Sequence, residues 1–251
     1  MADPIFAEPR LAAVYDLLDS DRSDLDVYAA IVIDELGARS VVDVGCGTGT
    51  FALLLADRGV DVTGIDPARA SVDVARRKHG AHRIRWVDGD ATGLPPMQAD
   101  VATMTANVAQ VFVDDGAWTS TLRAIHAALR PGGHLVFEAR RPEARAWEEW
   151  TKDATRQVVD CGEIGLVEEW VDVVSFEDDV VEFESPTIFH ADGARFESTS
   201  RLRFRSRESI EAALTACGFV VTDVRDAPDR PGREWIYLAQ RPEHPAAPGA
   251  S

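Results

Sequence analysis

Three glycines on alternate positions, Gly45, Gly47 and Gly49, stand between a short apolar run and a helix-like run. The apolar run, residues 41–44, is typical of a buried parallel strand, and residues 51–58 are typical of a short helix. Glycines at such a turn let a ligand approach the main chain closely, and the start of a helix offers unpaired N–H groups. This stretch therefore predicts a cofactor site.

The spacing of the glycines narrows the choice of cofactor. A dinucleotide-binding fingerprint has glycine at its first, third and sixth positions, so that a pyrophosphate sits on the helix N-terminus. Counted from Gly45, the sixth position is Thr50, so this interpretation fails at the third glycine and leaves a nicotinamide-dependent oxidoreductase as a distant alternative. Glycine-rich turns of this kind also arise for packing alone.

An acidic residue two positions before the first glycine, Asp43, completes the pattern D-x-G-x-G-x-G. This pattern resembles the first motif of the class I S-adenosylmethionine-dependent methyltransferases, in which the loop backs onto the methionine part of the cofactor. Cys46 lies inside the loop, where we interpret its small side chain as a space-filler, because no histidine close in sequence would activate the thiol.

A second strand-like run ends at Asp66 and Pro67, 19 residues beyond Gly47. Ligands of open parallel sheets bind beyond the carboxyl ends of the strands, so Asp66 is expected to accept hydrogen bonds from two ribose hydroxyls. A helix cap ahead of Pro67 is an alternative role that is compatible with the first. The same resemblance implies that Asp90, in the pair Asp90 and Ala91, accepts a hydrogen bond from the adenine amino group.

A further apolar run, residues 100–105, is followed by Asn107 and Gln110. In the resembled family this strand end faces the transferred methyl group, so both residues are candidates for contact with cofactor or acceptor, although residues capping the next helix would look the same. Enzymes that methylate amides of macromolecules often carry an Asn/Asp-Pro-Pro-Tyr/Phe box here, which this chain lacks, and we therefore expect a small-molecule acceptor. Leu-Arg-Pro-Gly-Gly at 129–133, before another apolar run, is a frequent signature of the same family.

The alternation of strands and helices over residues 38–140 predicts an α/β fold with a doubly wound, mostly parallel sheet of seven strands and helices on both faces. Residues 206–240 complete this core with a helix and a final hairpin. Residues 1–37 are expected to form an N-terminal helical cap, residues 141–205 an antiparallel insertion after the fifth strand, and residues 241–251 a disordered tail.

Within the insertion, period-2 patterns predict three or four strands, among them residues 167–173, 180–184 and 196–204. The position of the insertion resembles the lid of small-molecule methyltransferases, and its alternative role is a sheet extension that forms a homodimer. The weaker candidates for contact with the acceptor are Tyr15, Arg140, Trp147 and His190.

No catalytic residue is named from the sequence. An amine acceptor needs only its lone pair, whereas a hydroxyl acceptor would need a base, for which the candidates are His190, Glu138, His126 and His134. Each of these side chains also fits an ordinary structural position. Arg140 could clamp a carboxylate of the acceptor or pair with the many acids.

Composition limits the partners and the compartment. The 251 residues carry a net charge of -17, from 43 acidic and 26 basic side chains, and such a field repels nucleic acid. No apolar stretch approaches the ~20 residues of a membrane span and the first residues lack a secretion signal, so we expect no membrane partner and a cytoplasmic location. Three scattered cysteines predict neither a disulfide framework nor a metal site.

Taken together, these motifs predict an S-adenosylmethionine-dependent methyltransferase that modifies a nitrogen or oxygen atom of a small molecule. The alternative is a catalytically inert cofactor-binding or scaffold protein of the same fold.

Overall fold

A computed structural model describes residues 3–243, and its centre is a seven-stranded sheet in the order β13-β14-β5-β4-β1-β2-β3. The strands are β1 (Ser40–Val44), β2 (Asp61–Asp66), β3 (Arg85–Asp88), β4 (Ala99–Met104), β5 (Leu129–Arg140), β13 (Val220–Asp226) and β14 (Glu234–Gln240). The first five pair in parallel, while β14 is antiparallel to both β5 and β13. The predicted doubly wound, mostly parallel sheet is confirmed.

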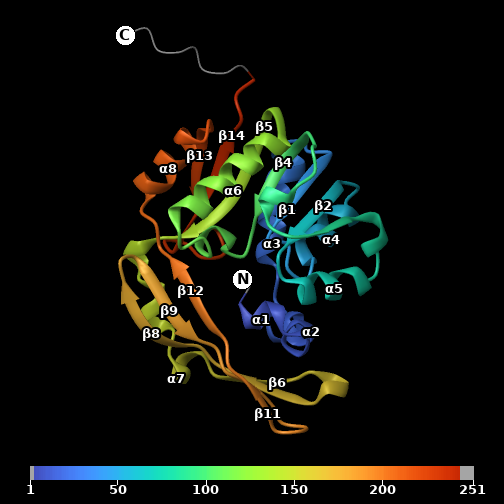
Figure 1. The fold of residues 1–251 in the computed structure, drawn as a ribbon, viewed down its shortest axis with the longest axis vertical. Coiled ribbons are helices and arrows are strands. Elements are labelled where there is room, and N and C mark those ends of the chain that lie inside the picture. Colours follow the sequence, from blue (N-terminus) through green and yellow to red (C-terminus); the bar gives the residue numbers. More distant parts are fainter. Residues whose placement is uncertain (1–2, 244–251) are drawn as a thin grey trace.

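Helices cover both faces of this sheet (Figure 1). One face packs against α6 (Asp115–Ala128) and α8 (Arg207–Ala216), and the other against α3 (Asp24–Ala30), the π-helical turn that follows it (Ile31–Glu35) and α4 (Thr50–Asp57). Successive side chains of a strand point to opposite faces. In β1, Val42 and Val44 accordingly join the core under α6, and Val41 joins the core under α3 and α4.

The remaining helical elements are short and lie mostly at the edges of the sheet or in the insertion. They are α1 (Pro4–Ala7), α2 (Pro9–Leu18), α5 (Arg69–Arg77), α7 (Lys152–Thr155) and the 3-10 turns Ala81–Arg83, Ala91–Gly93, Val108–Gln110, Pro142–Ala144, Ala146–Glu149 and Gly162–Ile164. None of the helices between residues 3 and 243 is long and apolar enough to cross a membrane.

The Pro-Gly-Gly segment lies inside β5, at an irregularity in its pairing with β4. Helix α6 ends at Ala128, and β5 begins at the next residue. A Cβ at Gly133 would come within 2.9 Å of two backbone oxygens, those of Arg130 and Asp100. Glycine is required there because the main chains approach closely.

The insertion after β5 is antiparallel, as predicted, but it holds more strands than expected. Within the described chain it forms a four-stranded sheet, β11-β10-β7-β6, and a three-stranded sheet, β12-β9-β8. The strands are β6 (Gln157–Asp160), β7 (Leu166–Glu169), β8 (Asp172–Glu177), β9 (Val180–Glu184), β10 (Thr187–Phe189), β11 (Ala194–Phe196) and β12 (Thr199–Arg203).

Two of the expected strands are therefore corrected. The stretch 167–173 is broken at Trp170 and Val171, where the chain passes from one small sheet to the other, and the stretch 196–204 is likewise divided between β11 and β12. Burial alternates across the second break, at Ser198 and Ser200, but not across the first, where Glu168 and Glu169 are both half-buried. Periodicity alone could not reveal the change of sheet.

The N-terminal helices α1 and α2 lie between the central sheet and the insertion (Figure 1). The Ser71 hydroxyl of α5 donates to the Phe6 carbonyl at 2.9 Å, and on the other side the Ile5 N–H donates to Ser198 Oγ at 3.1 Å. The first residues are thus bound to both parts of the molecule. The tail expected at 241–251 lies outside the described residues from position 244 onward.

Candidate functional site

A cavity of about 370 Å³ lies at the carboxyl ends of β1, β2 and β4. Nine residues singled out in the sequence line it: Asp43, Gly45, Cys46, Gly47, Asp66, Pro67, Asp90, Ala91 and Tyr15. The fold brings these residues together because parallel strands present their carboxyl ends at one edge of the sheet. The cavity is therefore the candidate functional site.

The glycine loop forms the floor of this cavity, and its glycines have different roles. Gly47, with φ of 52°, lines the cavity and has open space where a side chain would stand. Gly49, with φ of 79°, does not line the cavity, and a Cβ there would lie 2.4 Å from Trp86 and 2.9 Å from Ala75. Gly49 is thus required for packing, whereas Gly47 leaves its backbone open to a ligand.

Asp66 joins the end of β2 to the glycine loop and to the start of α5. Its Oδ2 accepts from the Gly47 N–H at 2.9 Å, and its Oδ1 accepts from the Ala68 N–H at 2.7 Å. Asp66 lies on the cavity wall, but it does not cap a helix that begins at Pro67 as expected, because α5 (Arg69–Arg77) has Ala68 as its N-cap and no side-chain cap. Burial raises the pKa of Asp66, and the two N–H groups oppose that shift. Each carboxylate oxygen still has a lone pair for a ligand hydroxyl.

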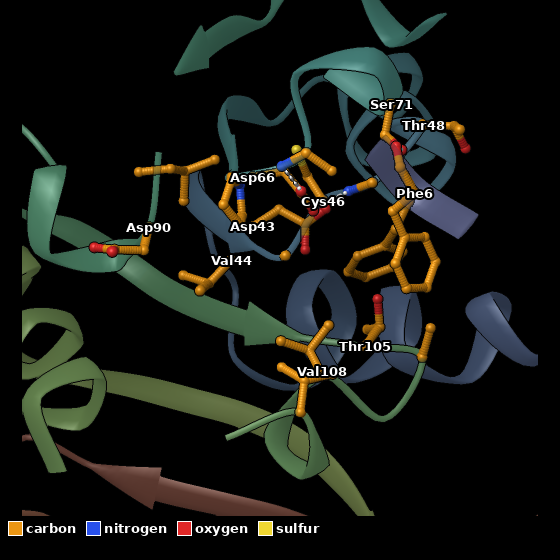
Figure 2. Close-up of a pocket in the computed structure, with 18 of the residues that line it drawn as sticks. Phe6, Asp43, Val44, Cys46, Thr48, Asp66, Ser71, Asp90, Thr105 and Val108 are labelled. Atoms are coloured by element: carbon orange, nitrogen blue, oxygen red, sulfur yellow. Dashed lines mark hydrogen bonds between the residues drawn. The ribbon is translucent and has the colours of Figure 1, made fainter. Parts of the chain in front are cut away.

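Asp43 is a nearly fully buried carboxylate beside Asp66 (Figure 2). Its Oδ1 accepts from the Thr103 hydroxyl of β4 at 2.8 Å. Burial raises the pKa of Asp43 to about 7, with Asp66 adding to the shift and Arg22 opposing it. A cationic ligand group next to this carboxylate would stabilise its charged form.

Cys46 also lines the cavity and keeps its proton. Burial raises the pKa of its thiol, and the charges of Asp43 and Asp66 raise it further. The thiolate is the nucleophilic form of cysteine, so the shift makes Cys46 inert, in agreement with its interpretation as a space-filler.

Asp90 lies at the edge of the cavity in an exposed position. Its Oδ1 accepts from the Thr92 N–H at 2.9 Å and from the Thr92 hydroxyl, which caps the 3-10 turn beginning at Ala91. Figure 2 shows the Asp90 carboxylate pointing away from Asp43 and Asp66. Of the predicted cofactor residues on the cavity wall, Asp90 is thus oriented least favourably for a ligand.

The structure does not bring Asn107, Gln110 or Arg140 to the cavity wall. The Asn107 side-chain amide donates to Glu234 Oε1 at 3.3 Å, and Arg140 Nη1 donates to Gln110 Oε1 at 3.1 Å. Arg140 Nε lies 3.5 Å from Glu234 Oε1. These residues form a buried polar cluster behind the loop that follows β4, where their partners are other protein groups.

Trp147 and His190 also lie away from the cavity wall. The Trp147 ring belongs to the apolar core of the three-stranded sheet and stacks on the exposed Phe176 ring with centroids 4.4 Å apart. The exposed His190 ring places Nε2 3.0 Å from Glu168 Oε2 on the four-stranded sheet. Both are explained by contacts within the insertion.

Several cavity residues were not singled out in the sequence. Phe6 and Arg22 come from the N-terminal segment, Phe112 from the turn after β4, and Arg201 from β12 of the insertion. Phe6 belongs to an amphipathic lead-in that could have been examined for cavity residues. No local sequence pattern predicts that Arg201 lines the cavity, because its position depends on how the insertion folds back over the core.

Together, these groups suit a ligand with a cation, a carboxylate and adjacent hydroxyls. Asp43 can neutralise a cation and Asp66 can accept from hydroxyls, while Arg22 is a cation on the same cavity that can bind a carboxylate. Val44 and Ile65 add apolar wall for a flat ring. The residues fit S-adenosylmethionine, which carries each of these groups.

Part of the chain matches a known domain. Residues 41–133 match the family model described as a methyltransferase domain. The cypemycin N-terminal methyltransferase of Streptomyces sp is 31% identical over 145 residues, which are 57% of this chain and 59% of that protein. The malonyl-[acyl-carrier protein] O-methyltransferase of Serratia marcescens is 36% identical over 132 residues, 51% of this chain and 49% of that protein. The chain thus spans about half the length of these curated relatives.

Solved structures share the fold over nearly the whole chain. Streptomyces venezuelae DesVI superposes with a TM-score of 0.73 at 20% identity, covering 90% of this chain and 97% of that one. The sugar N-methyltransferase KedS8 from Streptoalloteichus sp ATCC 53650 gives 0.71 at 24% identity, with 91% and 93% covered. The matched model assigns residues 41–133 to a methyltransferase domain, and the sheet order and these structures show that the chain as a whole has the same Rossmann-like fold.

Proposed function

We propose that this protein transfers a methyl group from S-adenosylmethionine to a nitrogen or oxygen atom of a small molecule. The observation that carries the proposal is that two buried carboxylates, Asp43 and Asp66, and the open backbone of Gly47 line one cavity at the carboxyl ends of β1 and β2. Asp66 would hold the ribose hydroxyls, Asp43 the methionine amino group and Arg22 the methionine carboxylate, and Asp90 would reach the edge of the adenine only after turning from its present bond to Thr92.

When bound, the cofactor would supply a methyl group attached to a positively charged sulfur, and the leaving group would be the neutral thioether that contains this sulfur. The protein then needs to align the acceptor and exclude water, since the leaving group is already activated. Phe6 and Phe112 are apolar residues of the cavity that can exclude water. Among the described residues that line the cavity there is no histidine, lysine or glutamate.

Of the aspartates on the described cavity wall, this proposal assigns Asp43, Asp66 and Asp90 to the cofactor and leaves Asp3 as the one remaining carboxylate, which favours an amine acceptor, whose neutral form attacks with its own lone pair. Tyr15 is no substitute, because burial raises the pKa of its phenol to about 12. The names of the cypemycin N-terminal methyltransferase and the sugar N-methyltransferase support this choice, while that of the O-methyltransferase relative keeps hydroxyl and carboxyl acceptors in the test. We further propose that the insertion acts as the lid on the acceptor side, through Arg201, and that a homodimer would form through the same insertion.

Calorimetric titration with S-adenosylmethionine and its demethylated product tests the cofactor site. We expect micromolar binding to the wild type and a loss of roughly 10- to 100-fold in Asp66→Ala, because hydrogen bonds to a charged group contribute about 1.5–3 kcal/mol each. Asp61→Ala, at the exposed opposite end of β2, is the matched control and should bind normally. Absence of binding at millimolar cofactor would refute the proposal.

Turnover is tested separately with amines, hydroxyls and carboxylates, with release of the demethylated cofactor as the readout. Methylation of an amine in this panel would support the preferred acceptor class. Cofactor binding without turnover across the panel would instead favour the inert cofactor-binding alternative.

A further inference from the structure

The loop after β4 has an unfavourable backbone conformation at the cavity wall. Ala106 and Asn107 are consecutive non-glycine residues with φ of 56° and 59°, in the left-handed region. Such residues persist only where surrounding contacts hold them. Thr105, Ala106 and Val108 line the cavity, so whatever holds the two left-handed residues also sets this part of the wall.

The loop is also seated tightly against the glycine loop. A Cβ added to Gly45 would lie 2.6 Å from a methyl carbon of Val108, so the valine occupies the space that a side chain at position 45 would take. Displacement of residues 105–108 would therefore alter both walls of the cavity at once.

A glutamate from the central sheet holds this loop from behind. The Asn107 N–H donates to Glu138 Oε1 at 2.8 Å, and the Asn107 side-chain amide donates to Glu234 Oε1 at 3.3 Å. Glu138 lies on β5 and is 3% exposed, and Glu234 lies on the adjacent strand β14 and is 2% exposed. Both acceptors are therefore buried on paired strands of the central sheet.

The two glutamates differ in their charged neighbours. Glu234 Oε1 lies 2.8 Å from Arg230 Nη1 and 3.5 Å from Arg140 Nε, so its charge is compensated. Glu138 instead has no ion-pair partner among the described residues, and its Oε1 accepts from the Asn107 N–H. Burial raises its pKa to about 7, and the Tyr28 hydroxyl, the Asn107 N–H and the Arg140 charge oppose that rise. Its Oε2 has no partner among the described residues. A buried carboxylate without an ion-pair partner is unfavourable unless it is hydrogen-bonded, and the Asn107 N–H supplies such a bond.

We propose that Glu138 is a positioning residue for the proposed methyl transfer, which holds residues 105–108 in their left-handed conformation by accepting the Asn107 N–H. It acts through the loop, because neither Glu138 nor Asn107 lines the cavity. The proposal rests on the proposed function for its kinetic consequence, but the restraint on the loop is independent of it.

Three variants separate this role from general stability. Glu138→Ala removes the acceptor, Glu138→Gln keeps an amide oxygen in its place, and Ala106→Gly lowers the cost of the left-handed conformation without removing more than a methyl group. Ala106→Gly is combined with Glu138→Ala in a double variant, and Ala106→Gly by itself is the control for the added backbone flexibility.

Hydrogen exchange of segment 105–111, measured by mass spectrometry without cofactor, is the first readout. We expect exchange at least about tenfold faster in E138A, near-wild-type exchange in E138Q, and partial recovery of protection in E138A/A106G. Unchanged exchange in E138A, or equal losses in E138A and E138Q, would overturn the proposal. This readout remains decisive even if the protein proves not to be a methyltransferase.

Steady-state kinetics are the second readout. A displaced wall should lower kcat about 10- to 100-fold in E138A and raise KM for the cofactor by a smaller factor, and E138Q should restore most of kcat. A rise in KM for the cofactor with unchanged kcat contradicts the role. Should E138A fail to fold, recovery of a cooperative melting transition in E138A/A106G supports the proposal, and failure of both overturns it.

Discussion

Asp43 is the residue whose protonation is best placed to control cofactor binding. Its pKa of about 7, raised from 3.8 by burial, means that the carboxyl is largely protonated at pH 6 and largely ionised at pH 8 in the free protein. A cationic ligand group beside it favours the ionised form. Binding below pH 7 must therefore release the proton, and affinity should fall as the pH drops through 7.

This linkage gives a prediction for calorimetry in buffers of different ionisation enthalpy. At pH 6 the wild type should release about one proton on binding S-adenosylmethionine, and affinity should fall about tenfold for each further unit of pH below that. Asp43→Asn cannot release this proton, so its heat of binding should no longer depend on the buffer, and its binding should be weaker throughout. Buffer-independent heats for the wild type at pH 6 would contradict the assignment.

At the scale of elements, helix α2 is fastened to the glycine loop by a single carboxylate. Asp16 Oδ1 accepts from the Thr48 hydroxyl at 2.5 Å and from the Thr50 hydroxyl at 3.2 Å, while Asp16 Oδ2 lies 2.6 Å from Lys78 Nζ. Thr48 and Tyr15, on the two sides of this contact, both line the cavity. The N-terminal cover is thus bound to the same loop that forms the cavity floor.

Loss of the Asp16 contact should release helix α2 from the glycine loop while the glycine loop itself keeps its conformation. In Asp16→Ala we expect the cofactor to dissociate roughly tenfold faster, because charge-assisted hydrogen bonds contribute about 1.5–3 kcal/mol. Stopped-flow displacement measures the rate, and Lys78→Met should act in the same direction and not additively with it. Additive effects would show that the two side chains act separately.

The central sheet and the cavity floor could be predicted from the sequence because each depends on local patterns. Strand, glycine turn and helix follow one another between Asp43 and Asp66, and the edge of a parallel sheet brings both acids together. The two small sheets of the insertion could not be predicted, since alternation does not specify which strands pair. Arg201 and the Asn107 contact with Glu138 depend on partners far away in sequence, so no local pattern reveals them.

At the scale of the whole molecule, the insertion is joined to the core where β12 leads back toward α8. Arg203 Nη1 donates to the Val113 carbonyl and to Asp115 Oδ1, each at 2.9 Å, and Arg205 Nη2 donates to the same carboxylate oxygen at 3.0 Å. Arg205 is 6% exposed, and its guanidinium also lies over the Trp118 ring. Asp115, at the start of α6, thus binds two arginines that end the insertion.

Asp115→Ala should therefore loosen the insertion and destabilise the fold moderately. Because this carboxylate is largely exposed, we expect a loss of about 1 kcal/mol, which lowers Tm by about 2–4 °C in a chain of this size. Scanning calorimetry measures the shift, and Asp114→Asn is unsuitable as a control because Asp114 caps α6. Asp153→Ala, in the short helix α7 of the insertion, is the better control and should leave Tm unchanged.

The residues that line the cavity come partly from inside and partly from outside the segment that matches the family model. Its floor comes from one continuous stretch, residues 43–112, inside the segment that matches the family model, whereas its cover comes from residues 3–22 and from Arg201, outside that segment. Because Asp16 and Arg22 of the N-terminal segment are assigned to cofactor binding, the insertion is the part of the cover whose exchange should change the acceptor alone. A chimera that keeps residues 1–140 of this chain and takes the insertion, residues 141–205, from a relative should inherit the relative's acceptor and retain this chain's affinity for the methyl donor.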